Sequence, residues 1–173
     1  ERKERDLYET PEWVTEALLW HLPSGRCSPT WEPACGSGKM VNVLKERGGL
    51  DVYASDIDLG SDFLEAKLST NARAIITNPP YEQATEFCEH ALRLMEPVHG
   101  FVAMLLRTDF DHAKGRSHLF RDCTAFAKKL VLTKRIVWFE PEPGAKGKSP
   151  SFNHAWFIWD WKHEGPPTIG YGP

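Results

Sequence analysis

The chain alternates between short apolar runs and longer stretches in which apolar residues recur three or four positions apart. The short runs predict strands in PTWEP, DVYASDID, RAIITNPP, GFVAMLLR, KKLVLT, RIVWF and FNHAWFIWDW. GFVAMLLR is apolar through most of its length, which is typical of a central strand covered on both faces. The aromatic residues of FNHAWFIWDW recur at alternating positions, so most are expected in the core of the sheet.

Between these runs lie segments in which the apolar residues recur at helical spacing. Helices are expected in TPEWVTEALLWHL, over residues 39–47, in EQATEFCEHALRLM and around residues 115–127, the last of these basic. Thr10 can cap the first helix, and Pro11 suits its first position. The tail HEGPPTIGYGP is expected to be a loose terminus.

Strands that alternate with helices predict an α/β fold with a mostly parallel, twisted sheet and helices on both faces. In such sheets the ligand binds beyond the carboxyl ends of the strands. Three chemically unusual stretches, EPACGSG, SDID and TNPPY, follow predicted strands. The fold therefore brings them together at one cleft, although they are far apart in the sequence.

The length of 173 residues suits one domain with a substantial core, so we expect a single catalytic domain over residues 1–173. No apolar run approaches the roughly 20 residues that span a bilayer, and ERKERDLYET resembles neither a signal nor a transit peptide. The cysteines are scattered, without a C-x-x-C pair. This spacing argues against a zinc site and a disulfide framework, and favours a reducing cytoplasm.

The net charge of −3 is unevenly distributed along the chain. Residues 101–135 contain eight Lys/Arg and three Asp/Glu, whereas residues 1–100 contain ten Lys/Arg and 17 Asp/Glu. A basic segment on an acidic domain is consistent with a nucleic-acid contact. From charge alone, an ordinary solvated basic face explains the segment equally well.

The glycine-rich stretch EPACGSGK argues against two phosphate-binding motifs, excluding the first and weakening the second. A P-loop would need glycine where Pro33 stands and Ser or Thr where Met40 stands. A dinucleotide fingerprint would need a third glycine at Val41. Two interpretations remain, a tight turn at Gly36 and Gly38 that lets a ligand lie against bare backbone, and a plain turn between strand and helix.

Asp56 favours the ligand-binding interpretation because it follows Gly36 by 20 residues, at the end of the next strand. A spacing of about 20 residues is typical of the carboxylate that accepts from ribose hydroxyls. Asp58 is an alternative for this role, and Asp56 could instead only cap a turn. A nucleoside-bearing cofactor without a diphosphate fits both signals, and S-adenosylmethionine (AdoMet) is such a cofactor.

The motif NPPY is suited to hold an amino group. The prolines stiffen the backbone and keep Asn78 extended, so its side-chain oxygen and the Pro79 carbonyl can form a rigid pair of acceptors. An exocyclic NH2 group has two hydrogens to donate to such a pair. Tyr81 offers a face on which a base can stack. The alternative interpretation is a rigid surface turn.

EPACGSG followed by TNPPY resembles the AdoMet-dependent amino-methyltransferases, above all the adenine-N6 DNA methyltransferases and their small phage and prophage members. The resemblance covers about residues 7–161, and the order of the motifs is similar to the gamma arrangement. It implies a Rossmann-like class I methyltransferase fold with an antiparallel C-terminal strand. NPPY is shared with enzymes that methylate RNA bases or a protein glutamine.

The resemblance also implies roles for individual residues. Those expected at the cofactor are Tyr8 and Thr10 of YETP, Glu32, Ala34, Cys35, Gly36 and Gly38 of the glycine motif, Asp56, Ile57, Asp62, Phe63 and Asn78. Those expected in catalysis are Asn78, Pro79, Pro80 and Tyr81. Phe152 is expected to hold the target base from the side opposite Tyr81, with a place in the core as the alternative.

The family's DNA enzymes usually carry a separate target-recognition domain after the last catalytic strand, and here only about a dozen residues follow it. We therefore expect no such domain, and nucleic-acid contacts from basic loops instead. The candidates are Arg107, Lys114, Arg116, Arg121, Lys146 and Lys148. Contacts of this kind to phosphates carry no sequence information. No metal is expected, because His112 and His118 lack a third ligand at suitable spacing.

The sequence thus predicts transfer of a methyl group from AdoMet to an exocyclic amine, with N6 of adenine in DNA as the leading candidate. The alternatives are an amino group of RNA or of a protein glutamine, and an inactive AdoMet-binding or assembly protein. The expected partner is nucleic acid, DNA foremost, and no membrane contact is expected. The expected location is the cytoplasm, which is the host cytoplasm if the chain is phage-encoded.

Overall fold

A computed structural model of the chain describes residues 8–67, 71–138 and 152–173. Within these ranges the α-helices are α1 (Glu12–Leu19), α2 (Lys39–Glu46) and α3 (Ala84–Met95). The strands are β1 (Thr30–Glu32), β2 (Val52–Ala54), β3 (Ala74–Thr77), β4 (Phe101–Arg107), β5 (Phe126–Leu132), β6 (His154–Asp160) and β7 (Thr168–Gly172). Short 3-10 turns connect several of them, and the longest described one is Lys114–Leu119.

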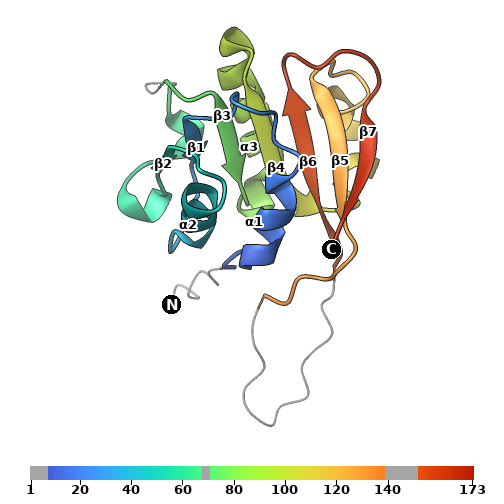
Figure 1. The fold of residues 1–173 in the computed structure, drawn as a ribbon. Coiled ribbons are helices and arrows are strands. Elements are labelled where there is room, and N and C mark those ends of the chain that lie inside the picture. The colour runs from blue at the N-terminus through green and yellow to red at the C-terminus, as the bar shows by residue number, and fades with distance from the viewer. Residues whose placement is uncertain (1–7, 68–70, 139–151) are drawn as a thin grey trace.

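The strands form one sheet in the order β2-β1-β3-β4-β6-β5-β7 (Figure 1). β2, β1, β3 and β4 are parallel, β6 is antiparallel to both of its neighbours, and β7 is parallel to β5. The prediction of a mostly parallel sheet with an antiparallel strand near the C-terminal end is confirmed. In this arrangement β1, β3, β4 and β5 run in the same direction. Their C-terminal ends therefore lie along one edge of the sheet, and their N-terminal ends lie along the opposite edge.

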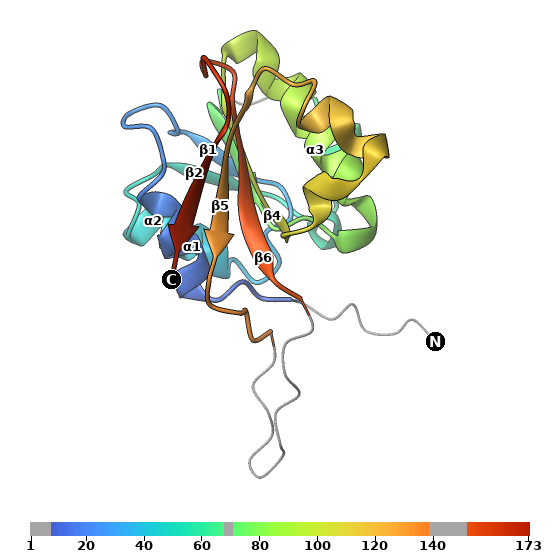
Figure 2. The ribbon, with the colours of Figure 1, turned by 90° about the vertical axis from the view of Figure 1, so that its right-hand side faces the viewer.

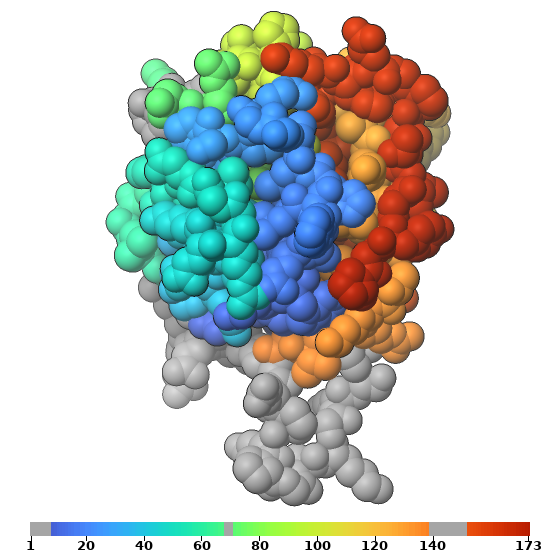
Figure 3. Space-filling model, in the orientation of Figure 1, coloured from blue at the N-terminus to red at the C-terminus, as the bar shows by residue number. Residues whose placement is uncertain are grey.

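Helices cover both faces of the sheet. In Figure 2, α1 and α2 lie on one side of the sheet, and α3 lies on the other with the segment that precedes β5. The space-filling view shows the blue segment that contains α1 on the sheet, between the cyan segment of α2 and β2 and the red β7 (Figure 3). Two apolar clusters result, one on each face, and together they make the core.

The strongest sequence patterns form the elements that they predict. Six of the seven residues of β4 are buried, as expected for a central strand that is apolar and covered on both faces. The apolar stripe of α3 is buried against the sheet. The Trp-rich segment is core, as predicted, because Trp156 and Trp159 in β6 are fully buried.

Three local predictions are wrong. The tail is not loose, because Thr168–Gly172 pairs with β5 along five residues. The basic helix around residues 115–127 is replaced by the 3-10 helix Lys114–Leu119 and the start of β5. In RIVWF, residues 135–138 form no strand, and Phe139 lies outside the described residues.

In the part of the chain that the structure describes, no helix has both the length and the apolar character needed to cross a membrane.

Candidate active site

The three unusual stretches meet because their strands are parallel neighbours. β1 lies between β2 and β3, so EPACGSG, SDID and TNPPY follow the same edge of the sheet. Backbone hydrogen bonds lock the first two together. The Cys35 N–H donates to the Ser55 carbonyl across 3.0 Å, and the Ser55 N–H donates to the Glu32 carbonyl across 3.0 Å. The predicted convergence is thereby present in the structure.

The glycine turn needs glycine at both of its positions. Gly36 has φ +50° and Gly38 has φ +86°, in the left-handed region that other residues rarely adopt. The Gly38 N–H donates to the Cys35 carbonyl across 2.8 Å, which closes the turn just before α2. A Cβ at Gly38 would meet no atom within 4 Å, so this side of the turn faces open space.

Asp56 ties the glycine turn to the end of β2. Its Oδ2 accepts the Gly36 N–H across 2.9 Å, and its Oδ1 accepts the Asp58 N–H across 2.9 Å. The carboxylate is half-buried. An ionised carboxylate offers about four acceptor positions, so two hydroxyl groups can still donate to Asp56 in addition to these amides.

The residues after Asp56 form two short turns. Ile57 is exposed, and Asp62 caps the second turn by accepting the Leu64 N–H across 2.9 Å. Phe63 is only 2% exposed, and its ring packs edge-on against Trp31. Phe63 is therefore a core residue beneath this edge, and its contact with a cofactor stays a prediction.

Glu32 is the buried carboxyl group beneath the glycine turn. Its side chain is fully buried, and Oε1 accepts the Ala34 N–H across 3.1 Å. The pKa of Glu32 is raised from 4.5 to about 7, chiefly because burial disfavours the ionised form and to a smaller extent because the Asp56 carboxylate is near, while hydrogen bonds to Glu32 oppose the shift. Cys35 lies three residues after Glu32 and is half-buried. Its burial, together with the charges of Glu32 and Asp56, raises the pKa of its thiol.

Asn78 lies half-buried at the end of β3, followed by buried Pro79 and exposed Pro80. Its Nδ2 donates to the Thr10 hydroxyl across 3.3 Å. The sequence suggested that Thr10 caps α1, and this prediction is wrong. Pro11 takes the cap position, and no side chain caps the helix. The YETP motif instead reaches NPPY directly, which brings two of the predicted motifs into contact.

The two aromatic side chains predicted to hold a base both contact Arg107. Tyr81 is 70% exposed and Phe152 is 50% exposed, so Phe152 is not a core residue. The Arg107 Nη1 donates to the Tyr81 hydroxyl across 3.0 Å. The Arg107 Cζ lies 3.9 Å from the centre of the Phe152 ring and 5.8 Å from that of Tyr81.

Three neighbours of this cluster were not among the site residues that the sequence predicted. Asp109 holds the Arg107 guanidinium with two hydrogen bonds of 3.1 and 2.8 Å. His154 pairs with Arg107 across β4 and β6, and burial and the Arg107 charge lower its pKa, although a backbone bond at Phe152 opposes the shift. Trp138 packs edge-on against His154 at 5.2 Å between ring centres.

Trp138 also connects this cluster to the YETP motif, because the Tyr8 ring meets it edge-on at 5.6 Å. An acidic residue two positions after Arg107 was a usable signal for Asp109 in the sequence. The places of Trp138 and His154 depend on how β5 and β6 pair, which no local pattern reveals.

The predicted basic contacts fall in different places. Arg107 is in the cluster just described, and Lys114 is exposed at the start of the 3-10 helix. Arg116 lies on the Phe110 ring at 3.9 Å from its centre. Arg121 precedes β5 and lies at the edge of the sheet opposite the site, because β6 is antiparallel to both β4 and β5 and these two strands therefore run in the same direction. Lys146 and Lys148 lie outside the described residues.

Comparisons with known proteins identify the fold. No family model matches the sequence, and no curated protein matches it. A Listeria monocytogenes protein described as a class I S-adenosylmethionine-dependent methyltransferase is similar in structure, with a TM-score of 0.67 and 15% identity over 98% of this chain and 67% of its own. The Streptococcus thermophilus methyltransferase subunit of a type I restriction-modification system has a TM-score of 0.64 and 13% identity.

That second match covers 90% of this chain and 45% of the restriction-modification subunit. The M protein of the type I restriction enzyme EcoKI gives a TM-score of 0.55 with 15% identity, over 91% of this chain and 45% of its own. This chain thus spans less than half of the two restriction-modification proteins. The fold is that of the Rossmann-like class I methyltransferases, as the resemblance implied.

Proposed function

We propose that this chain binds AdoMet and transfers its methyl group to an exocyclic amine, with N6 of adenine in DNA as the substrate group. The observation that carries the proposal is the hydrogen bond from Asn78 Nδ2 to Thr10. With its NH2 group directed at Thr10 through one of its two hydrogens, Asn78 has Oδ1 left as an acceptor at the end of β3. The glycine turn follows the adjacent strand β1, so acceptor and turn share one edge of the sheet.

The residues at this edge fit AdoMet. Gly36 and Gly38 present bare backbone, with open space beside Gly38, against which a ligand can lie closely. The Asp56 carboxylate is half-buried and retains acceptor capacity for the two ribose hydroxyls. When bound, AdoMet supplies a methyl group on a sulfonium, which is electrophilic without a metal or a covalent enzyme intermediate. Ile57, exposed just after Asp56, is suited to pack on the adenine ring.

The role of Asn78 and Pro79 is to accept the two hydrogens of the substrate amine. The lone pair of such an amine is conjugated into its ring, and two acceptors favour the tetrahedral shape in which it can attack. They also stabilise the positive charge that develops on nitrogen, at about 1.5–3 kcal/mol for each hydrogen bond to a charged group. Each bond then contributes about ten- to a hundredfold in rate. Alignment of the amine with the methyl carbon contributes further.

Exposed aromatic and cationic groups beside the acceptor favour a nucleobase. Tyr81 and Phe152 are exposed aromatic side chains, and Arg107 contacts both of them. Stacking on aromatic side chains holds unpaired bases at about 1–3 kcal/mol each. Two of the similar structures belong to type I restriction-modification systems, which is consistent with a DNA base. A duplex base would have to be extruded to reach this edge.

The experiment that tests this function is incubation with AdoMet labelled on its methyl group and with DNA, RNA or a protein mixture. Digestion and nucleoside analysis should find the label in N6-methyladenine from DNA. Label in an RNA nucleoside or in methylated glutamine would replace DNA adenine as the substrate. Absence of transfer to all three, with AdoMet bound, would identify a binding protein without catalytic activity.

A further inference from the structure

Arg107 uses each of its three guanidinium nitrogens in the free protein. Nε and Nη2 donate to the Asp109 carboxylate, and Nη1 donates to the Tyr81 hydroxyl across 3.0 Å. The side chain is still 26% exposed. The cation is therefore held in one orientation by an acid on one side and a phenol on the other.

This orientation puts the flat guanidinium against the ring of Phe152. The Cζ lies 3.9 Å from the ring centre of Phe152, a distance typical of a stacked planar group, and 5.8 Å from the ring centre of Tyr81. With the cation there, no base can stack on that face of Phe152 while Tyr81 holds the guanidinium.

We infer that Arg107 occupies, in the free protein, the space that the target base takes between Tyr81 and Phe152, and that base and guanidinium exchange. This inference rests on the proposed function. Entry of the base breaks the contact with Phe152 and the hydrogen bond to Tyr81. The bond to Asp109 can persist, because it lies on the other edge of the guanidinium. Nη1 is then available to a phosphate of the same strand.

The exchange has a consequence that an ordinary phosphate contact lacks. Removal of the Arg107 side chain weakens binding of the strand as a whole, because a cation is lost. It also strengthens the separate contribution of the base, because the base no longer displaces the cation from Phe152. The two effects have opposite signs and can be measured separately.

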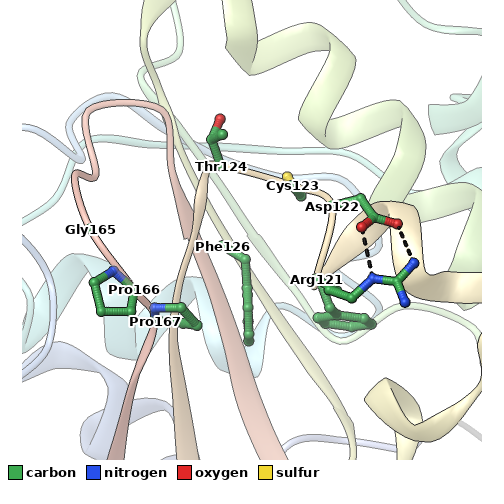
Figure 4. Close-up of a pocket in the computed structure, with 9 residues that line it drawn as sticks. Arg121, Asp122, Cys123, Thr124, Phe126, Gly165, Pro166 and Pro167 are labelled. Atoms are coloured by element: carbon green, nitrogen blue, oxygen red, sulfur yellow. Dashed lines mark hydrogen bonds and ion pairs between the residues drawn. The ribbon is translucent and has the colours of Figure 1, made fainter.

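The chain supplies a matched control in Arg121. Arg121 makes the same kind of two-bond pair, with Asp122 at 2.8 and 2.9 Å, and is 79% exposed. Figure 4 shows this pair at a hollow lined by residues that include Phe126, Pro166 and Pro167. The hollow lies at the start of β5, at the edge of the sheet opposite Asn78.

The test compares two oligothymidine strands, one with a single adenine and one with an abasic site in its place. Dissociation constants are measured by fluorescence anisotropy with S-adenosylhomocysteine present, so that no turnover occurs. The ratio of the abasic to the adenine constant reports the contribution of the base. Wild type is compared with Arg107→Ala, Arg107→Lys and Arg121→Ala.

In Arg107→Ala we expect this ratio to rise about two- to fivefold, the range of a cation–π contact at an exposed site. Both dissociation constants should rise, and the salt slope should fall by about one. Arg107→Lys should raise the ratio with little change in the slope, because lysine keeps the charge and loses the planar fork. Arg121→Ala should leave the ratio unchanged.

A ratio that stays constant in Arg107→Ala would overturn the exchange. A ratio that falls would overturn it too, because Arg107 would then contact the bound base and contribute to its binding. Both results would leave the proposed methyl transfer intact. A wild-type protein that bound neither strand would instead overturn the assignment of nucleic acid, and the exchange with it.

Discussion

The Asn78 amide donates to the Thr10 hydroxyl across 3.3 Å and so joins two motifs that are 68 residues apart. Thr10 is only 5% exposed, which protects this bond from competing water. A planar amide that donates through Nδ2 has its Oδ1 directed away from the partner. Thr10 therefore fixes which atom of Asn78 faces the site, and we regard it as a positioning residue.

Thr10→Val keeps the shape of the side chain and removes the acceptor. We expect kcat to fall about two- to tenfold, the scale of one neutral hydrogen bond, with the AdoMet dissociation constant changed less than twofold in calorimetry. Thr10→Ser, which keeps the hydroxyl, should restore most of kcat. A weaker AdoMet affinity with normal kcat would show that Thr10 serves the cofactor alone.

Asn78→Ala removes the acceptor itself. Turnover should become undetectable in the labelled-methyl assay, while the AdoMet dissociation constant stays near the wild-type value. The side chain is half-buried at the end of a strand, so the melting temperature should change little. An unaltered kcat in this variant would exclude the catalytic role of Asn78.

Asp56→Ala tests the ribose contact. The AdoMet dissociation constant should rise well above tenfold, because a charged acceptor is lost. Asp58→Ala is the matched control, two residues further on, and should have a smaller effect. If Asp58→Ala had the larger effect in calorimetry, Asp58 would be the ribose-binding acid. Because Asp56 holds the glycine turn at Gly36, circular dichroism should be used to check that helix α2, which follows this turn, stays folded in Asp56→Ala.

Tyr81→Ala tests base stacking, and Tyr81→Phe separates the ring from its hydroxyl. The alanine variant should lose about 1–3 kcal/mol of strand binding, as measured by anisotropy. The phenylalanine variant keeps the ring and loses only the hydrogen bond from Arg107, so its affinity should not fall below wild type and should rise slightly, because entry of the base then breaks one bond fewer. Normal strand affinity and rate in Tyr81→Ala would make Tyr81 a structural residue.

Glu32 makes the free energy of unfolding depend on pH. Its pKa is raised from 4.5 to about 7, so the folded protein disfavours the ionised form. The Glu32 contribution is fully present below pH 4.5 and is lost as pH rises through 7, by about 3 kcal/mol at 1.36 kcal/mol per pKa unit. Glu32→Gln cannot ionise and should lack this loss.

The measurement is urea unfolding of both proteins from pH 4 to pH 8. The difference between wild type and Glu32→Gln cancels the titration of the other groups, the buried histidines included. A difference that did not vary with pH would mean that Glu32 ionises over the same pH range in the folded and the unfolded protein, so that its pKa is not raised by folding.

The sequence was sufficient where local pattern and tertiary packing agree. β4 and α3 follow from their apolar spacing, and the glycine turn follows from residues that tolerate positive φ. The meeting of EPACGSG, SDID and TNPPY at one edge of the sheet follows from parallel topology alone. The hypotheses about which residues contact cofactor and substrate still await the experiments above.

The sequence was insufficient where long-range pairing decides. Three glycines and three prolines in HEGPPTIGYGP suggest a loose tail, yet β5 offers a free edge to Thr168–Gly172. Gly115 and Ser117 favour helix only weakly, and the segment after them enters β5 because Phe126 pairs with Trp159. Arg107 meets Phe152 because β4 pairs with β6, a register that links residues far apart.

A crystal structure with S-adenosylhomocysteine bound would test the proposed function most directly. We expect the ribose hydroxyls at Asp56, the chain of the ligand beside Gly36 and Gly38, and its sulfur facing Asn78 Oδ1 and the Pro79 carbonyl. A ligand bound away from this edge of the sheet, or Asn78 and Pro79 oxygens turned from its sulfur, would overturn the proposed methyl transfer.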